Sequence, residues 1–320
     1  MAARDAGSPK TTWEISGQTY DLYCCLLSSA VHSGRSEKSL TPFPPCFMKG
    51  TVKDFDRLRR VLALMPPASD LFKASPNITF GNGDLMEEMN EFLKPHFQTV
   101  TSLDDGVALF EFILKKQCNR KFSVHYISYQ NYLKKNSSLV MKPDHIFELR
   151  WDKNVELNDL ERSYTGYHGS AIENFFSIMT NSLQNYSGTE HMTTGNAFGN
   201  GIYLCEDVRV ARDFSKGGLI GWKNSKLGSH MSAVVQCKVA GLPEYAMGAK
   251  NDKNRYLIVK NSEDVKIQYL LLFSHFKNEK ELESSRAASH RMIYFYIFLL
   301  IAIIIGNYWK DIKRELKKLT

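Results

Sequence analysis

Apolar residues recur at helical spacing through the first third of the chain. The pattern is clearest in residues 52–65, where the run ends at the pair Pro66-Pro67. The same spacing recurs in residues 20–31, 85–93 and 107–114. We therefore predict a small helical domain over residues 15–120, after a disordered N-terminus at residues 1–14.

Beyond residue 121 the pattern changes to short apolar or alternating runs, which are typical of β-strands. These runs are residues 146–149, 163–168, 201–205, 233–239, 256–259 and 265–273. Helical spacing recurs between them in residues 171–183 and 207–214. Many strands with few helices predict an α+β domain with antiparallel pairing over residues 121–276.

One uninterrupted apolar segment lies near the C-terminus. Residues 292–309 hold no charged side chain over 18 positions, and as a helix they would span roughly 27 Å, enough for a hydrocarbon core. A buried core helix is the alternative, but such a helix usually keeps a polar stripe, whereas this segment is apolar all round. We predict a single transmembrane helix, with a polar linker at residues 277–291 before it and a short basic tail at residues 310–320 after it.

The position of this segment predicts tail anchoring with the body of the protein in the cytosol. Few residues follow the segment, so insertion would come after translation, and the N-terminus shows no apolar stretch of a secretory signal. The positive-inside tendency points the other way, because it would hold the basic tail on the cytosolic side. We give more weight to the N-terminus, since moving a folded body across a membrane is harder than moving a short tail. The basic flanks leave the mitochondrial outer membrane as an alternative destination.

Charge and cysteine content argue against nucleic-acid binding and against a zinc site. The net charge is +7, and residues 310–320 hold five basic side chains against two acidic ones. The rest of the chain shows no clustered basic patch, so no nucleic-acid partner is expected. The six cysteines form no C-x-x-C pair, and no histidine spacing suggests zinc. We expect reduced thiols and no bound metal.

Three short stretches carry candidate chemistry. They are Tyr167-His168-Gly169-Ser170 at the end of a predicted strand, residues 198–204 (FGNGIYL), and residues 265–273 (VKIQYLLLF). Each alone has an ordinary structural interpretation. A strand-end His-Gly is usually a turn, a G-x-G before a strand is usually a tight bend, and an apolar strand with one tyrosine is usually core.

Together and in this order, the three stretches resemble the catalytic domain of the poly-ADP-ribose polymerase (PARP) family of ADP-ribosyltransferases. The resemblance covers residues 146–276, with F-G-x-G-I-Y as its most specific part. It implies a split antiparallel β-sheet fold. The helical domain before it and the apolar segment after it resemble the tail-anchored, mono-transferring branch of the family. That branch implies the endoplasmic reticulum membrane and the continuous nuclear envelope.

The resemblance also implies which residues bind NAD⁺. His168 would contact the adenine-side ribose, and Gly169 would bind the nicotinamide amide through its backbone. The remaining contacts would be to the adenosine ribose from Ser170 and Asn174, and to the nicotinamide ring from Tyr203 and Phe214. Residues 184–197 would form the loop that covers the donor. Ala211 stands where many members place a serine hydroxyl, a departure that would weaken NAD⁺ binding.

The third catalytic position, after His168 and Tyr203, is Tyr269, where polymer-forming members carry glutamate. A phenol, with an ordinary pKa of about 10, is a poor base near neutral pH. The resemblance therefore implies a glycosyltransferase of the pentosyl-transfer type. It would move one ADP-ribose from NAD⁺ to protein side chains, including its own, and release nicotinamide. The alternative is a catalytically weak NAD-binding or scaffold protein held on the same membrane.

Overall fold

The computed structural model describes residues 13–80, 85–117, 121–137, 139–152, 163–186, 199–240, 244–247 and 255–275. The chain divides into two compact units, Met1–His275 and Phe276–Thr320, and all the described residues lie in the first. The predicted transmembrane helix at residues 292–309 and the flanking linker and tail lie outside the described residues. Within the described part, no helix is long and apolar enough to cross a membrane.

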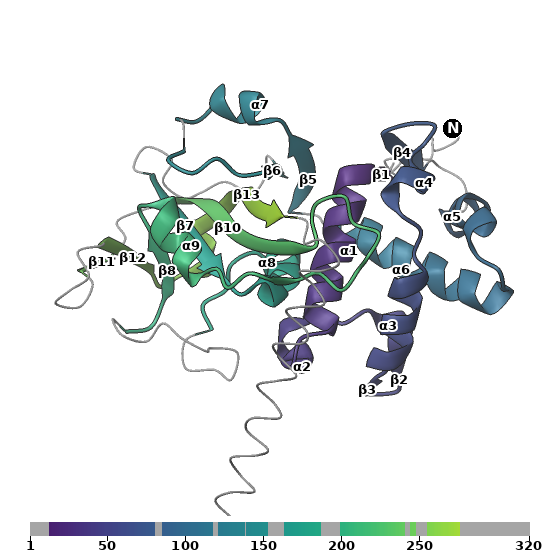
Figure 1. Cartoon of the computed structure of the whole chain (residues 1–320). Helices are drawn as coiled ribbons and strands as arrows, with labels where there is room; N and C mark the ends of the chain where they lie inside the picture. The colour runs from purple at the N-terminus through teal and green to yellow at the C-terminus, as the bar shows by residue number, and fades with distance from the viewer. Residues whose placement is uncertain are drawn as a thin grey trace, which may run out of the picture. The chain divides into compact units, whose positions relative to one another are not determined.

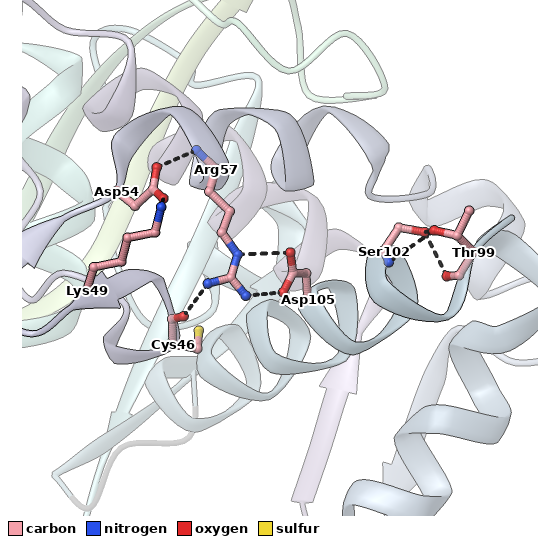
Figure 2. Close-up of polar contacts among 7 residues, drawn as sticks. All are labelled: Cys46, Lys49, Asp54, Arg57, Thr99, Ser102 and Asp105. Atoms are coloured by element: carbon pink, nitrogen blue, oxygen red, sulfur yellow. Dashed lines mark hydrogen bonds and ion pairs between the residues drawn. The ribbon is translucent and has the colours of Figure 1, made fainter.

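The N-terminal region is helical, as the periodicity predicts. Its helices are α1 (Gly17–Val31), α2 (Ser36–Ser39), α3 (Phe55–Leu64), α4 (Ala68–Leu71), α5 (Leu85–Leu93) and α6 (Val100–Gln117), with the 3-10 turns η1 (Pro45–Phe47) and η2 (Lys94–His96). Two small antiparallel pairs join them, β1 (Trp13–Ser16) with β4 (Asn77–Phe80) and β2 (Met48–Lys49) with β3 (Val52–Lys53). Helix α6 begins earlier than predicted because Thr99 caps its first turn, where its hydroxyl accepts from the Ser102 backbone N–H at 3.2 Å (Figure 2).

Polar contacts connect the segments of this helical region. The Asp54 carboxylate accepts a hydrogen bond from the backbone N–H of Arg57, which caps α3. The Arg57 guanidinium grips both carboxylate oxygens of Asp105 on α6 and donates to the Cys46 carbonyl at 3.2 Å (Figure 2). One side chain therefore joins α3, α6 and η1.

The remaining strands form one antiparallel sheet. They are β5 (Phe122–Ile127), β6 (His145–Trp151), β7 (Tyr164–Ser170), β8 (Ile202–Cys205), β9 (Gly218–Leu219), β10 (His230–Val239), β11 (Glu244–Met247), β12 (Arg255–Val259) and β13 (Val265–His275). Their order is β11-β12-β8-β7-β10-β13-β6-β5, with β9 added to β10 (Figure 1). The connecting helices are α7 (Tyr129–Leu133), α8 (Phe175–Asn181) and α9 (Val208–Phe214), with the turns η3 (Ile172–Asn174) and η4 (Ser262–Asp264).

The sheet divides between β7 and β8. These two strands share a single register pair, Tyr167 with Cys205, while every other neighbouring pair of long strands shares four or more. The pairing of these two strands is therefore confined to one point of the sheet. The α+β class with a helical N-terminal region and a large antiparallel sheet is confirmed.

Helix α1 departs from the expected bundle. A bundle helix buries one face, but α1 is buried all round, including Asp21 at 2% exposure. It packs against α3, α4 and α6 and also against η3, α8 and β5. One hydrophobic core therefore runs from the helical region into the sheet, across the domain boundary predicted at residue 120.

Candidate functional site

The two most specific predicted residues are joined across the split in the sheet. His168 lies on β7, and its ring Nδ1 donates a hydrogen bond to the Tyr203 backbone carbonyl on β8 at 2.9 Å. Burial lowers the pKa of His168, although the Tyr203 carbonyl opposes that shift. The neutral ring with Nδ1 protonated leaves Nε2 as a hydrogen-bond acceptor.

Gly169 is required by close packing. A Cβ at this position would overlap the Ala211 backbone oxygen of α9, a clash that backbone cannot relieve by a rotamer change. The family resemblance implies that this glycine is needed for the approach of nicotinamide. The structure gives a different reason, because α9 lies directly on β7 at this point. Ala211 itself is fully buried.

A cavity of about 600 Å³ opens beside the split, a size typical of small-molecule sites. The predicted donor residues all line it, and they are His168, Gly169, Ser170, Asn174, Tyr203 and Phe214. These residues lie on separate segments of the sequence, and the fold brings them together. Their individual roles remain predictions.

Local contacts orient these side chains. Asn174 donates from Nδ2 to the Ser170 hydroxyl at 2.9 Å, and the Tyr203 hydroxyl donates to the Gly199 carbonyl. Gly199 has φ +93°, a left-handed conformation that favours glycine. The Phe214 ring is 51% exposed and meets Tyr256 edge-on with centroids 6.3 Å apart. An aromatic face is therefore open at this end of the cavity.

Tyr269 is not among the described residues that line the cavity. It lies on β13, is 5% exposed, and meets the Tyr132 ring of α7 edge-on at 5.0 Å. Tyr132 in turn donates to the Gln236 side chain at 2.6 Å. Helix α7, which sequence periodicity did not predict, thus packs a side chain on Tyr269, the residue predicted at the third catalytic position.

The carboxylate that pairs with Tyr269 in the sheet is already held by cations. Glu148 of β6 faces Tyr269 in register, and its oxygens accept from Lys135 at 2.7 Å and Arg150 at 2.9 Å. Burial is the largest single influence on the pKa of Glu148 and raises it, but the two cations together outweigh burial and lower that pKa. Glu148 is therefore a poor proton acceptor.

Sequence reasoning missed part of the cavity wall. The missed residues include Cys205 and Tyr256 near Phe214, and Arg35, Lys38, Ser39 and Thr41 from the helical region. No spacing pattern connects residues 35–41 to the later motifs, so only the fold could show the connection. Of the predicted covering loop, Gln184 and Tyr186 line the cavity, and residues 187–197 lie outside the described residues. In the part of the chain that the structure describes, no three His, Cys, Asp or Glu side chains gather as a metal site.

His168 and Tyr203, joined between β7 and β8, are two of the residues that the family resemblance of the sequence implies for NAD⁺ binding. Comparison with known proteins agrees. Residues 17–93 match the family described as the ARTD15 N-terminal domain. The chain is 28% identical to the human protein mono-ADP-ribosyltransferase PARP16, over 92% of this chain and 94% of that protein. The mouse protein of the same name is 27% identical over the same shares. The resemblance to a PARP16-like mono-ADP-ribosyltransferase is thereby confirmed along nearly the whole chain.

Proposed function

We propose that this protein is a mono-ADP-ribosyltransferase that takes its donor, NAD⁺, in the cavity at the split between β7 and β8. The observation that carries the proposal is that all six predicted donor residues line this one cavity. The similarity to the two mammalian mono-ADP-ribosyltransferases supports the same activity.

The residues present fit a dinucleotide. Tyr203 and the exposed Phe214 ring offer aromatic faces for nicotinamide. His168 Nε2, as an acceptor, suits a ribose hydroxyl, and the Ser170–Asn174 pair offers further polar contacts to a sugar. These groups hold the donor in one orientation and exclude water from its reacting carbon.

The reaction exchanges one bond at that carbon. The bond between the ribose carbon and the nicotinamide nitrogen breaks, and neutral nicotinamide leaves with the bonding electrons. A nucleophilic side chain of the acceptor protein forms the new bond, and any proton it carried goes to solvent. The chain's task is to position the donor.

We propose that a single unit is transferred. Adding a second unit needs a sugar hydroxyl to attack, and a positioned carboxylate base would help that step by about 10²–10⁴-fold. The third catalytic position holds Tyr269, buried beneath Tyr132. The first transfer, to a carboxylate or thiolate, needs no such base.

We also propose that residues 292–309 anchor the chain in the endoplasmic reticulum membrane with the body in the cytosol. The support is the uncharged apolar run of 18 residues, which as a helix would be long enough to span a hydrocarbon core.

The test of function is automodification with labelled NAD⁺. Wild-type protein should become labelled, and His168→Ala or Tyr203→Ala should abolish labelling while the melting temperature stays nearly unchanged. The matched controls are His125→Ala and Tyr126→Ala on β5, outside this cavity, which should keep activity. Full activity in either cavity variant would show that the site is placed wrongly.

The product test uses the same labelled protein. Digestion should release single ADP-ribose units, and long ladders on a sequencing gel would refute the single transfer. The alternative function, a scaffold that binds NAD⁺ weakly, is favoured by Ala211, which has no hydroxyl to offer nicotinamide. Unlabelled wild-type protein under conditions where NAD⁺ binds would support that alternative.

A further inference from the structure

The helical region contributes side chains to the donor cavity. Arg35, Lys38, Ser39 and Thr41 line it together with the residues at the split in the sheet. This segment follows α1 directly and includes the short helix α2. The cavity wall is therefore built from two parts of the chain that are far apart in sequence.

Local hydrogen bonds hold this segment in shape. The Ser33 hydroxyl accepts from the Arg35 backbone N–H at 3.0 Å, and the Ser39 hydroxyl donates to the Arg35 carbonyl at 3.1 Å. The Arg59 guanidinium of α3 donates to the Val31 carbonyl at the end of α1, at 2.9 Å. Arg35 and Lys38 thus extend from a fixed backbone.

Buried contacts also tie the segment to the sheet side of the cavity. Asn181 at the end of α8 donates to the Thr41 carbonyl at 3.1 Å. The Tyr23 hydroxyl donates to the Met179 carbonyl at 3.3 Å, and the Asp21 carboxylate accepts from the Lys226 backbone N–H at 2.7 Å. Separating the two walls would break these hydrogen bonds, of which the Tyr23–Met179 bond is buried and the other two are partly buried, so the cavity keeps both walls in the folded protein.

The proposed donor site needs a partner for one further part of its ligand. NAD⁺ carries two negatively charged phosphates, but none of the six predicted donor residues carries a positive charge, since His168 is held neutral. The cationic side chains on the cavity wall are Arg35 and Lys38 from the helical region and Lys216 after α9. The anionic ones are Glu173 on η3 and Asp213 on α9. Asp213 adjoins Phe214, at the end assigned to the cationic nicotinamide, where a carboxylate is favourable.

We propose that Arg35 and Lys38 bind the diphosphate of the donor, so that the helical region completes the nucleotide site. The inference rests on the proposed function, because it assigns a part of the same cavity. Guanidinium and ammonium groups are the usual protein partners of phosphate oxygens. The helical region would then be needed for binding as well as for the shared core.

The experiment measures binding by calorimetry to the full chain in detergent, with ADP-ribose, which has the diphosphate, and adenosine, which does not. In Arg35→Gln/Lys38→Gln, ADP-ribose should bind about 10-fold weaker for each side chain removed, and adenosine binding should change less than about twofold. Arg35→Lys, which keeps the charge, should bind ADP-ribose more tightly than a variant that lacks the charge at this position. The double variant should also show a weaker dependence of ADP-ribose binding on salt.

The matched control is Arg60→Gln/Lys73→Gln, which removes the same charge from exposed positions of the helical region that do not line the cavity. It should bind both probes like wild type. If the cavity variant binds ADP-ribose like wild type, this inference is wrong and the proposed function stands. Equal weakening of adenosine would also overturn it, since the effect would then be on the shape of the site. If wild-type protein binds no ADP-ribose at all, the proposed function fails first.

Discussion

Removing the Arg57 side chain should measurably destabilise the helical region. Its guanidinium makes a two-pronged contact with Asp105 and a further hydrogen bond to the Cys46 carbonyl (Figure 2). It also lies 5.3 Å from the centroid of the Phe47 ring. Arg57→Ala removes all of these at once. It also leaves the Asp105 carboxylate, only 16% exposed, without this cation.

The expected loss follows from that geometry. Hydrogen bonds to charged groups contribute about 1.5–3 kcal/mol to stability when buried. The Arg57 side chain is 35% exposed, so solvent screening reduces the value, and we take about 2 kcal/mol for the whole change. A loss of 1 kcal/mol lowers the melting temperature by roughly 2–4 °C in proteins of 150–250 residues. Because the compact unit extends to His275, the lower end applies, and we expect a fall of about 4 °C.

The assay is thermal unfolding followed by circular dichroism, on wild type, Arg57→Ala, Asp105→Ala and the double variant. The two single changes should be strongly non-additive, because each removes the same contact. The control is Lys94→Ala, which breaks an ion pair with Glu91 whose side chains are 65% and 70% exposed. Such a pair contributes at most about 0.5–1 kcal/mol. If Arg57→Ala melts like the control, or if the cycle is additive, the reasoning is refuted.

Four further predictions concern the site and the anchor. Gly169→Ala should abolish donor binding and lower stability by about 1–3 kcal/mol or more, because its methyl group would overlap the Ala211 carbonyl; calorimetry and a thermal melt check it. NAD⁺ affinity should be flat from about pH 8 to 6.5 and fall only in more acidic solution, since the pKa of His168 lies below the ordinary histidine value of about 6.5. The lowered pKa of His168 also makes the free energy of unfolding depend on pH. The contribution of His168 is fully present above about pH 6.5 and is lost as the pH falls, because the unfolded chain then binds the proton more readily than the folded protein. Ending the chain near Lys277 should release the protein from membranes, and resistance of that form to alkaline extraction would show that residues 292–309 are not the anchor.

Local pattern predicted the elements well where one face of an element is apolar. Helix α5 spans the predicted residues 85–93, and β12 and β13 begin within one residue of the prediction. Strand β5 was missed although Phe122, Val124 and Tyr126 alternate with polar residues. Helix α7 was missed because its five residues are too few to show a helical period. The burial of nearly every residue of α1, Gln18 excepted, could not be predicted, since periodicity shows which face is apolar and not what covers the polar one. Asp21 illustrates this, because its partner Lys226 comes from a distant segment.

The candidate site likewise has a part that could be predicted from local sequence and a part that could not. The motifs identified His168 and Tyr203, and the fold places them one hydrogen bond apart. The motifs could not show that Gly169 is required by the Ala211 carbonyl, because that contact depends on how α9 lies on β7. Nor could they show that Arg35 lines the same cavity. Both contacts join residues that are far apart in the sequence, so they become visible only once the fold is known.

The place of β13 in the sheet has a consequence for synthesis. It is the last described strand in chain order, yet it lies between β10 and β6 (Figure 1). Without β13, β6 would have only β5 as a neighbour in the sheet, and β10 would present an open edge with unpaired backbone groups. Such edges are prone to pair with other chains. The body can therefore close only when the apolar segment at residues 292–309 is itself about to emerge. A newly made chain would therefore need protection from association while both the open edge of β10 and the apolar segment are exposed.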